Sequence, residues 1–398
     1  MLRKNVLPNS RWWKQNKQKQ KIVTQKKILK MKAIISGGGT GGHIFPAVAI
    51  ANAIKARYAD ADILFIGAEG RMEMEKVPAA GYPIKGLPIA GLQRSLSPKN
   101  IMKNLAVPFK LLKSQSMAKK IIRNFNPDVV VGVGGYASAP TLKTAAKMGY
   151  PTLLQEQNSY PGLTNKMLSA HADVICVAYN GLEKFFPAEK IVFTGNPVRK
   201  VIEDMSVTKA EGCTTFQVNP DKRIVLSVGG SLGARTINET LCANLKYFID
   251  NDIQLIWQTG KGYYKQAKEA VEAAGAANVK VCEFISQMDH AYAAADAIIS
   301  RAGAISISEL CLVGKPVILI PSPNVAEDHQ TKNAMALVNN GAALMVRDAE
   351  AMTTLCPTLD SLIGDTDKQK TMSEAILKMG MRNAADKIVD QIEKILKK

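Results

Sequence analysis

The residues with the clearest chemical potential form a glycine-rich run that ends in a histidine, Gly37-Gly38-Gly39-Thr40-Gly41-Gly42-His43. Glycine has no Cβ, so the backbone can adopt positive φ and approach a ligand closely. The free N–H groups at the start of the helix that we expect after the run suit a phosphate. Pro46 fits the first turn of that helix. A turn that only packs a strand against a helix is the alternative, but the entropy cost of so many glycines favours ligand contact.

A second constellation lies later in the chain, between Arg301 and Glu309. Gly303 permits a sharp turn into a helix whose first turns would hold Ser306, Ser308 and Glu309. A carboxylate there can accept hydrogen bonds from two vicinal hydroxyls, such as those of a ribose. A charge partner for the helix N-terminus would explain Glu309 equally well.

Known nucleotide-binding patterns fit the first run loosely. Gly37, Gly39 and Gly42 have the spacing of a dinucleotide fingerprint, but that match is weak in so glycine-rich a run. The acid expected to bind a ribose after the second strand is poorly placed, since Glu69 is the nearest candidate. No Gly-Lys-Ser/Thr follows the run, which excludes a P-loop.

Both constellations belong to a regular alternation of strands and helices. The expected strands cover residues 32–36, 62–67, 128–131, 151–155, 174–178 and 191–194, and then 223–228, 253–258, 280–285, 297–300 and 316–320. The run Gly229-Gly230-Ser231-Leu232-Gly233 aligns with Gly38–Gly42, which indicates an internal repeat. We therefore predict an α/β fold with two doubly wound parallel-sheet domains that face each other across a cleft.

Composition limits the class of protein. A chain of 398 residues suits two domains. Its six cysteines are scattered without a CxxC pair, so neither a disulfide framework nor a zinc site is indicated, and a reducing cytoplasmic setting is expected. Of the net charge of +18, ten positive charges fall in residues 1–30, which hold no acid. This basic leader lacks the apolar core of a secretory signal, and we expect a disordered tail or a misassigned start before Met31.

The segment from Pro98 to Asn124 allows two interpretations. Apolar residues at helical spacing, such as Phe109 and Leu112, usually indicate a face packed on a core. The segment also contains many lysines and no acid, and such a helix is attracted to an anionic membrane surface. Core packing and membrane docking both stay open, and they are compatible with each other.

Six motifs in order give the sequence its identity: Gly-Gly-Thr-Gly-Gly-His at 38–43, Val-Gly-Gly-Tyr-Ala-Ser at 133–138, Glu-Gln-Asn at 156–158, Gly-Asn-Pro-Val-Arg at 195–199, Gly-Gly-Ser-Leu-Gly-Ala-Arg at 229–235 and Arg-Ala-Gly-Ala-Ile-Ser-Ile-Ser-Glu at 301–309. From Met31 onward the chain resembles the MurG family of glycosyltransferase family 28. Members are bacterial N-acetylglucosaminyltransferases that convert lipid I to lipid II in peptidoglycan synthesis.

The resemblance implies a GT-B fold with two Rossmann-like domains. Residues 31–199 would form the N-terminal acceptor and membrane domain, and residues 200–377 the C-terminal domain that binds UDP-GlcNAc. Residues 378–398 would form a helix that packs back on the N-terminal domain. Such a protein would work peripherally on the cytoplasmic side of the inner membrane, with the cell-wall and division machinery as possible partners.

The family's functional positions can be carried over residue by residue. Donor contacts would fall on Thr40, Gly41, Gly42, Asn158, Arg199, Ser231, Ile285, Ala304, Glu309 and Gln330. Among these, Glu309 would bind the ribose, the backbone near Ile285 the uracil, and the loop of Ser231 the diphosphate. The acceptor side would include Gly134, Gly135, Tyr136 and Ser138. The loop from 321 to 330 is longer than in some relatives, so His329 competes with Gln330 for the GlcNAc hydroxyls.

The implied reaction is an inverting transfer of GlcNAc from UDP-GlcNAc to the MurNAc 4-hydroxyl of undecaprenyl-pyrophosphoryl-MurNAc-pentapeptide. His43 is the candidate base, because it ends the glycine run and can titrate near neutral pH. Backbone amides and Arg199 could relieve the charge on the leaving UDP, so we expect neither a metal nor a cofactor. Two alternatives remain, a UDP-GlcNAc 2-epimerase of the same fold and a basic protein that binds membranes or nucleic acid. The concentration of charge in residues 1–30 argues against nucleic acid as a partner.

Overall fold

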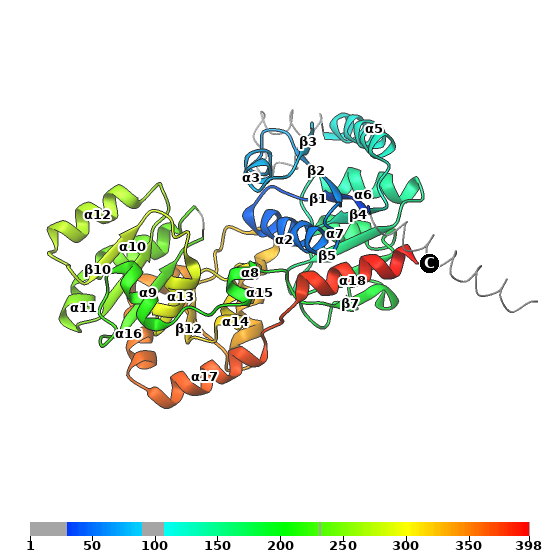
Figure 1. Ribbon diagram of the computed structural model, residues 1–398. Helices are drawn as coiled ribbons and strands as arrows, with labels where there is room; N and C mark the ends of the chain where they lie inside the picture. The colour runs from blue at the N-terminus through cyan, green and yellow to red at the C-terminus, as the bar shows by residue number, and fades with distance from the viewer. Residues whose placement is uncertain (1–29, 90–106, 231, 398) are drawn as a thin grey trace, which may run out of the picture.

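The computed structural model of the protein describes residues 30–89, 107–230 and 232–397. Figure 1 shows two α/β domains side by side, joined near α8 and by the segment between α17 and α18. The predicted leader at 1–30, except Lys30, and the first part of the basic segment at 98–124 lie outside the described residues. Across the described part of the chain, no helix combines the length and the hydrophobicity that a membrane crossing requires.

The first domain is built on seven parallel strands in the order β3-β2-β1-β4-β5-β6-β7. The strands are β1 Lys32–Ser36, β2 Asp62–Ala68, β3 Ile84–Leu87, β4 Val129–Gly132, β5 Thr152–Glu156, β6 Val174–Val177 and β7 Ile191–Phe193. The order reverses between β1 and β4, so the loops after these two strands diverge at one point of the sheet edge. Ligands bind at such switch points in open α/β sheets.

The second domain repeats this arrangement with six parallel strands in the order β10-β9-β8-β11-β12-β13. The strands are β8 Ile224–Val228, β9 Gln254–Gln258, β10 Val279–Cys282, β11 Ala297–Ser300, β12 Val317–Leu319 and β13 Leu344–Met345. Here β8 and β11 flank the switch point, as β1 and β4 do in the first domain. The predicted fold class is therefore confirmed.

Helices cover both faces of each sheet. Successive side chains of a strand point to opposite faces, and in these parallel sheets the side chains on both faces are buried. In the first domain they are α2 Gly41–Arg57, α3 Glu73–Ala79, α5 Val107–Phe125, α6 Ser138–Lys147 and α7 Leu163–Leu168. In the second domain they are α8 Lys200–Glu203, α9 Lys209–Phe216, α10 Arg235–Ala243, α11 Leu245–Asp250, α12 Tyr264–Ala273, α13 Met288–Ala294, α14 Ala304–Val313, α15 His329–Val338, α16 Ala351–Ile363 and α17 Thr366–Lys378. Ala33 and Ile35 of β1 pack toward α2, whereas Ile34 packs toward α5 and α6.

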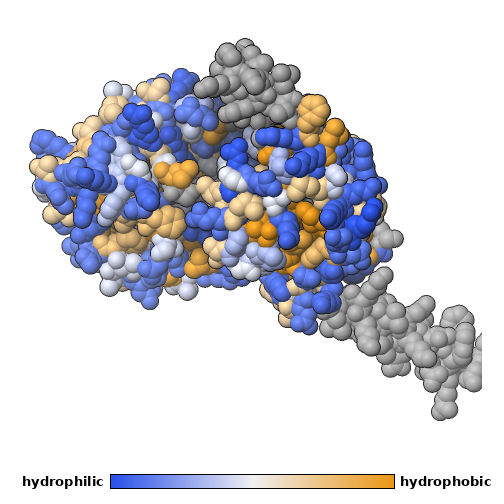
Figure 2. All heavy atoms as spheres, turned by 90° about the horizontal axis from the view of Figure 1, so that it is seen from above, coloured by the Kyte–Doolittle hydropathy of each residue, from blue (hydrophilic) through white to orange (hydrophobic). Residues whose placement is uncertain are grey.

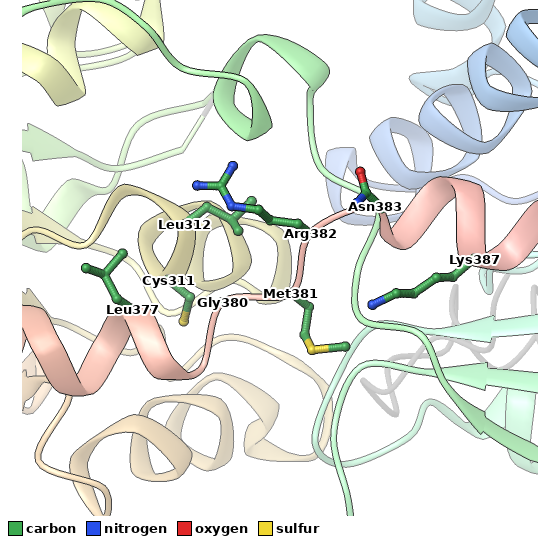
Figure 3. Close-up of a pocket in the computed structure, with 8 residues that line it drawn as sticks. All are labelled: Cys311, Leu312, Leu377, Gly380, Met381, Arg382, Asn383 and Lys387. Carbon is green, nitrogen blue, oxygen red and sulfur yellow. The ribbon is translucent and has the colours of Figure 1, made fainter.

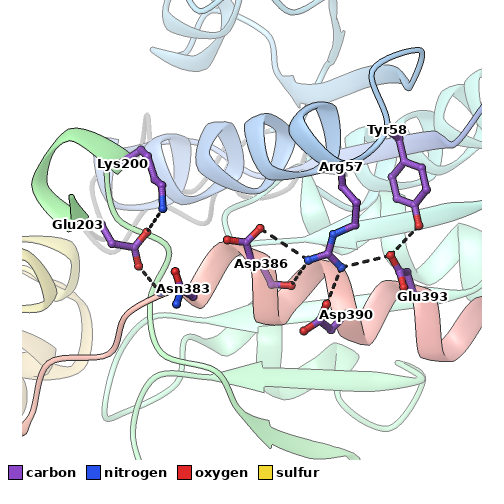
Figure 4. A network of polar contacts seen from close by, with 8 residues as sticks. All are labelled: Arg57, Tyr58, Lys200, Glu203, Asn383, Asp386, Asp390 and Glu393. Carbon is purple, nitrogen blue, oxygen red and sulfur yellow. Dashed lines mark hydrogen bonds and ion pairs between the residues drawn. The ribbon is translucent and has the colours of Figure 1, made fainter.

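The last helix, α18 (Ala384–Leu396), leaves the second domain and packs beside α2 of the first. Its buried side chains Ile388, Val389 and Ile392 join the apolar cluster beneath α2. Figure 4 shows the polar side of this contact, where Arg57 of α2 reaches three acids of α18. The crossover to α18 ends at Asn383, which has a φ of 58° and acts as the N-cap residue.

Three local predictions were wrong. Helix α2 already begins at Gly41, because the N–H groups of His43 and Ile44 both donate to the carbonyl of Thr40, and Pro46 therefore lies in the second turn. Strand β10 ends at Cys282 instead of reaching residue 285. The segment from 200 to 221, predicted to be irregular, contains α8 and α9.

Candidate active site

The residues that follow the strands of the two sheets meet at the domain interface. Asn333 of α15 accepts hydrogen bonds from the N–H and the hydroxyl of Ser159, at 3.0 and 2.9 Å, and donates to Asn158 at 3.1 Å. Nearby, Asn196 donates to the hydroxyl of Ser308 on α14 at 3.0 Å. The carboxyl ends of both sheets therefore face each other, and the predicted motifs gather between them.

His43 lies in the first turn of α2, directly behind the β1 loop. Its Nδ1 lies 3.0 Å from the carbonyl oxygen of Gly38. Because a carbonyl oxygen can only accept, Nδ1 carries the proton in the neutral ring and Nε2 keeps a free lone pair. Gly134 follows β4 with a φ of 93°, and a Cβ there would lie 2.9 Å from Nε2. Glycine at 134 therefore leaves the room that Nε2 needs.

Burial lowers the pKa of His43 below its ordinary value of 6.5. The carboxylates of Glu156 and Glu73 and the carbonyl of Gly38 oppose this shift in part, while His329 adds to it. The ring is therefore neutral at pH 7 and can accept a proton. Because His329 is the first residue of α15, the second domain also contributes to the electrostatics of this ring.

The two glycine loops of the first domain stack closely. A Cβ on Gly135 would lie 2.5 Å from the carbonyl oxygen of Gly38, so only glycine permits this approach. Ser138, predicted on the acceptor side, is fully buried, and its hydroxyl lies 2.6 Å from the Ser36 carbonyl and 3.0 Å from the Gly134 carbonyl. Its side chain thus supports the loops from behind, whereas Tyr136 is 46% exposed.

The other residues of the first glycine run that were predicted to contact the donor lie at the start of α2. Thr40 is the N-cap residue and is exposed. The N–H groups of Gly41 and Gly42 precede the first hydrogen bonds of the helix, which are those of His43 and Ile44. These amides can bind an anion or a sugar oxygen.

Arg199 and Glu309, both predicted to contact the donor, bind each other in this structure. The guanidinium donates from Nε and Nη2 to the two carboxylate oxygens, each at 2.7 Å. Tyr292 lies 3.3 Å from the same carboxylate, and burial raises the pKa of this tyrosine, so its hydroxyl stays protonated. The Glu309 side chain is only 6% exposed. A ribose hydroxyl would therefore have to share Glu309 with Arg199 or displace it.

The other predicted donor residues are distributed around the second sheet. Ser231 itself lies outside the described residues, but its loop is shaped by Gly233, where a Cβ would lie 1.9 Å from the carbonyl oxygen of Thr259. Ile285 is buried in the core of the second domain, so only its backbone can reach a ligand. Ala304 is the first residue of α14. The side chain of Gln330, in the first turn of α15, accepts a hydrogen bond from the N–H of Ser322 in the preceding loop at 2.8 Å.

Two buried carboxylates near His43 have no counterpart among the predicted site residues. Glu156 accepts hydrogen bonds from the N–H and side chain of Asn158, the N–H of Gly162 and the side chain of Asn165. It belongs to the quoted Glu-Gln-Asn motif, which could have signalled it. Glu73 accepts from the N–H groups of Gly39 and Ala68 and lies outside all six motifs.

A separate pocket of about 380 Å³ lies at the crossover to α18 (Figure 3). Its lining residues are Cys311, Leu312, Leu377, Gly380, Met381, Arg382, Asn383 and Lys387. None of the predicted site residues is among them, so the pocket is distinct from the site around His43.

Comparisons with known proteins agree with the geometry. Residues 33–177 match the glycosyltransferase family 28 N-terminal domain, and residues 224–388 match the family 28 C-terminal domain. A relative from Parabacteroides distasonis is 56% identical over 93% of this chain and 99% of its own length. A relative from Bacteroides thetaiotaomicron is 58% identical over 92% of this chain and 98% of its own length. Both are named UDP-N-acetylglucosamine–N-acetylmuramyl-(pentapeptide) pyrophosphoryl-undecaprenol N-acetylglucosamine transferase.

Solved structures show the same relationship. The crystal structure of MurG from Acinetobacter baumannii superposes with a TM-score of 0.74 at 30% identity, covering 92% of this chain and 99% of that one. A UDP-GlcNAc 2-epimerase from Neisseria meningitidis, solved with UDP-GlcNAc, has a TM-score of 0.63 at 15% identity over 92% of this chain and 100% of its own, so it shares the fold alone. The chain thus belongs to glycosyltransferase family 28.

Proposed function

We propose that this protein transfers GlcNAc from UDP-GlcNAc to the MurNAc 4-hydroxyl of lipid I, which yields lipid II for peptidoglycan synthesis. The names and high identity of the relatives support this reaction. The observation that carries the mechanism is the pairing of Nδ1 of His43 with the Gly38 carbonyl, because it leaves Nε2 as a proton acceptor at the loops after β1 and β4.

The chemistry is a single displacement at the anomeric carbon of GlcNAc. The acceptor oxygen forms a bond to this carbon, the bond to the UDP oxygen breaks with its electron pair, and configuration inverts. The hydroxyl proton passes to Nε2 of His43, whose lowered pKa keeps it neutral beforehand. Negative charge develops on the leaving diphosphate. Backbone N–H groups in the loop before α10 can stabilise this charge by donating hydrogen bonds to the phosphate oxygens.

Arg199 and Glu309 fit the donor's nucleotide. Glu309 offers a carboxylate to two vicinal hydroxyls, and Arg199 beside it offers a cation to the diphosphate. Since the two side chains bind each other here, donor binding would exchange part of their mutual contact for contacts with UDP. In this proposal the donor binds mainly to the second domain, and the acceptor binds at the loops around Gly134 and Tyr136.

The test follows GlcNAc transfer to a lipid I analogue. We expect His43→Ala to lower kcat by roughly 10²- to 10⁴-fold, the usual contribution of a general base, with the KM for UDP-GlcNAc nearly unchanged. His171→Ala, a change of an exposed histidine far from the loops, is the matched control. An unchanged kcat would refute the assignment, and an equal loss of donor binding would make His43 a substrate contact. Consumption of UDP-GlcNAc without any acceptor would instead indicate an epimerase.

We also propose that α5 docks this enzyme on an anionic membrane surface, where a lipid-linked acceptor resides. Ala118 and Ile122 of α5 are fully buried against the sheet, whereas Phe109 and Leu112 are 75% and 65% exposed. The helix carries five Lys and Arg residues and no acid. In Figure 2 the first domain, on the right, shows hydrophobic side chains among hydrophilic ones. An apolar edge with flanking cations is the chemistry of a peripheral membrane helix.

Vesicle binding tests this surface. The double change Phe109→Ser and Leu112→Ser should weaken co-sedimentation with vesicles of anionic phospholipid by about tenfold or more, because two apolar side chains no longer leave water. Transfer to a water-soluble acceptor analogue should persist. Met352→Ser, at a 48% exposed apolar residue of the second domain, is the control. Equal vesicle binding by the double variant would exclude α5 as the docking element.

A further inference from the structure

Glu73 on α3 is a buried carboxylate to which the mechanism above gives no role. Only 1% of the Glu73 surface is exposed to solvent. Oε2 accepts a hydrogen bond from the N–H of Gly39 at 2.8 Å, and Oε1 accepts one from the N–H of Ala68 at 3.0 Å. One side chain from α3 therefore connects the loop after β1 with the last residue of β2.

The backbone around Glu73 is shaped to admit this carboxylate. A Cβ on Gly38 would lie 2.2 Å from the carboxyl carbon of Glu73, and a Cβ on Gly67 would lie 2.6 Å from its Cγ. Both distances are far below contact distance, so two glycines are required for the side chain to reach the β1 loop. Gly39 has a φ of 89° and needs glycine for its conformation as well. The carboxylate is thus enclosed by its own built site.

A single peptide plane connects Glu73 with His43. The N–H of Gly39, which Glu73 binds, and the carbonyl of Gly38, which Nδ1 of His43 approaches, belong to the same peptide group. In a planar trans peptide these two groups point in opposite directions. Fixing the N–H toward Glu73 therefore points the carbonyl toward His43. A carboxylate that accepts from the N–H also polarises the peptide and makes its carbonyl oxygen a better acceptor.

We propose that Glu73 is a positioning residue for the transfer reaction, which acts through the Gly38–Gly39 peptide to hold the Gly38 carbonyl against Nδ1 of His43. It thereby selects the tautomer in which Nε2 is free to take the acceptor's proton. The carboxylate corresponds in role to one that binds a catalytic histidine directly, with one peptide group inserted between them. This inference rests on the proposed function of His43 as the base.

A merely structural Glu73 would also matter for folding, so the test must separate the two roles. Glu73→Gln keeps the volume of the side chain but places an amide NH₂ against one of the two backbone N–H groups. If Glu73 acts through His43, the cost in kcat must depend on the presence of His43. A double-mutant cycle measures this dependence.

The cycle compares the wild-type protein, Glu73→Gln, His43→Ala and the double variant in the transfer assay. We expect Glu73→Gln to lower kcat by roughly 10- to 100-fold, the usual effect of a residue that orients a functional ligand, with the KM for UDP-GlcNAc nearly unchanged. In the His43→Ala background the same change should cost less than about twofold. Glu75→Gln, at a side chain that is 81% exposed on the same helix, is the matched control and should behave as wild type.

A direct readout of the imidazole tautomer does not depend on activity. Nitrogen-15 NMR of the histidine rings at about pH 7, with the His43 signals identified by their loss in His43→Ala, should show the proton on Nδ1. In Glu73→Gln, part of the population should shift to the form with the proton on Nε2.

The outcomes separate this inference from the proposed function. An unchanged kcat in His43→Ala would overturn the base assignment. A normal effect of His43→Ala, combined with an equal loss from Glu73→Gln in both backgrounds, would overturn the positioning role alone. A wild-type His43 with its proton on Nε2, or a tautomer that Glu73→Gln leaves unchanged, would overturn it as well.

Discussion

At the scale of single residues, the site uses the main chain to prepare a side chain. The Gly38 carbonyl determines which nitrogen of His43 carries the proton, and the missing Cβ at Gly134 leaves room beside the other nitrogen. The hydrogen bond to the Gly38 carbonyl also raises the pKa of His43 in part, but burial outweighs it. The protonation state of the ring depends further on three ionisable groups near it, which are Glu156, Glu73 and His329.

The pH dependence of the reaction follows from this balance. Burial and His329 lower the pKa of His43 by more than Glu156 and Glu73 raise it, so the base stays neutral until the pH falls below the ordinary value of 6.5. The acid limb of kcat/KM should therefore have its midpoint below 6.5, with a flat rate from there toward about pH 8. A profile of kcat/KM from about pH 5 to 8 checks this, and a midpoint above 6.5 in the free enzyme would contradict it.

The same shift has a consequence for stability. Between pH 6.5 and the lower pKa of the native state, the unfolded chain binds a proton at His43 that the native protein does not bind. This contribution therefore favours unfolding as the pH falls through 6.5.

Single residues also show the limit of the sequence. His43 could be predicted because it ends a recognisable glycine run, and Glu309 because it follows Gly303 into a helix. Glu73 could not, since the hydrogen bond to Gly39 spans 34 positions and no local pattern marks it. The ion pair between Arg199 and Glu309 could not be predicted either, because these residues are 110 positions apart.

At the scale of elements, the sequence located most strands but not their ends. Runs of buried apolar residues reveal parallel strands such as β4 and β11. Gly41 and Gly42 look like loop residues in the sequence, yet they occupy the first turn of α2, because nothing in a glycine run marks where positive φ stops. Strand β13 has only two residues, too short for any periodicity to show.

Helix α18 tests whether apolar burial or ion pairs attach a helix to its domain. Ile392 is fully buried in the first domain's core, so Ile392→Ala should lower the free energy of unfolding by about 2–5 kcal/mol. Arg57, by contrast, binds three solvent-accessible acids of α18, two of them about half exposed and Glu393 26% exposed, so Arg57→Met should cost less than about 1 kcal/mol. Urea unfolding measures both, with Leu396→Ala at a 37% exposed position as control. A larger loss from Arg57→Met would mean that charge, not burial, attaches the helix.

At the scale of the whole molecule, the chain passes between the domains twice and the two crossovers are joined. Glu203 on α8 accepts a hydrogen bond from the N–H of Asn383 and lies 3.4 Å from the ammonium of Lys200 (Figure 4). Its own carbonyl accepts from the guanidinium of Arg382. Any change in the angle between the domains must therefore bend both crossovers together. The sequence predicted the repeat of the two domains, but their contacts join residues such as 159 and 333 that no local pattern relates.

Asn333 tests whether the contact between the domains sets the geometry of the site. It is fully buried, and its side-chain oxygen accepts both the N–H and the hydroxyl of Ser159, while its amide donates to Asn158. Asn333→Ala leaves the Ser159 N–H unpaired, which costs about 1–3 kcal/mol of unfolding free energy, and it releases Asn158, a predicted donor contact. We therefore expect a higher KM for UDP-GlcNAc together with a lower kcat.

The control for this change is Asn340→Ala, just beyond the C-terminal end of the same helix, where an exposed side-chain amide donates to the carbonyl of Ala336. It should alter stability by less than about 0.5 kcal/mol and leave both kinetic constants unchanged. Thermal unfolding and steady-state kinetics of the two variants decide the question. If Asn333→Ala loses stability but keeps wild-type KM and kcat, the contact between α15 and the β5 loop holds the domains together without positioning the donor, and the domain angle must then be set at the two crossovers instead.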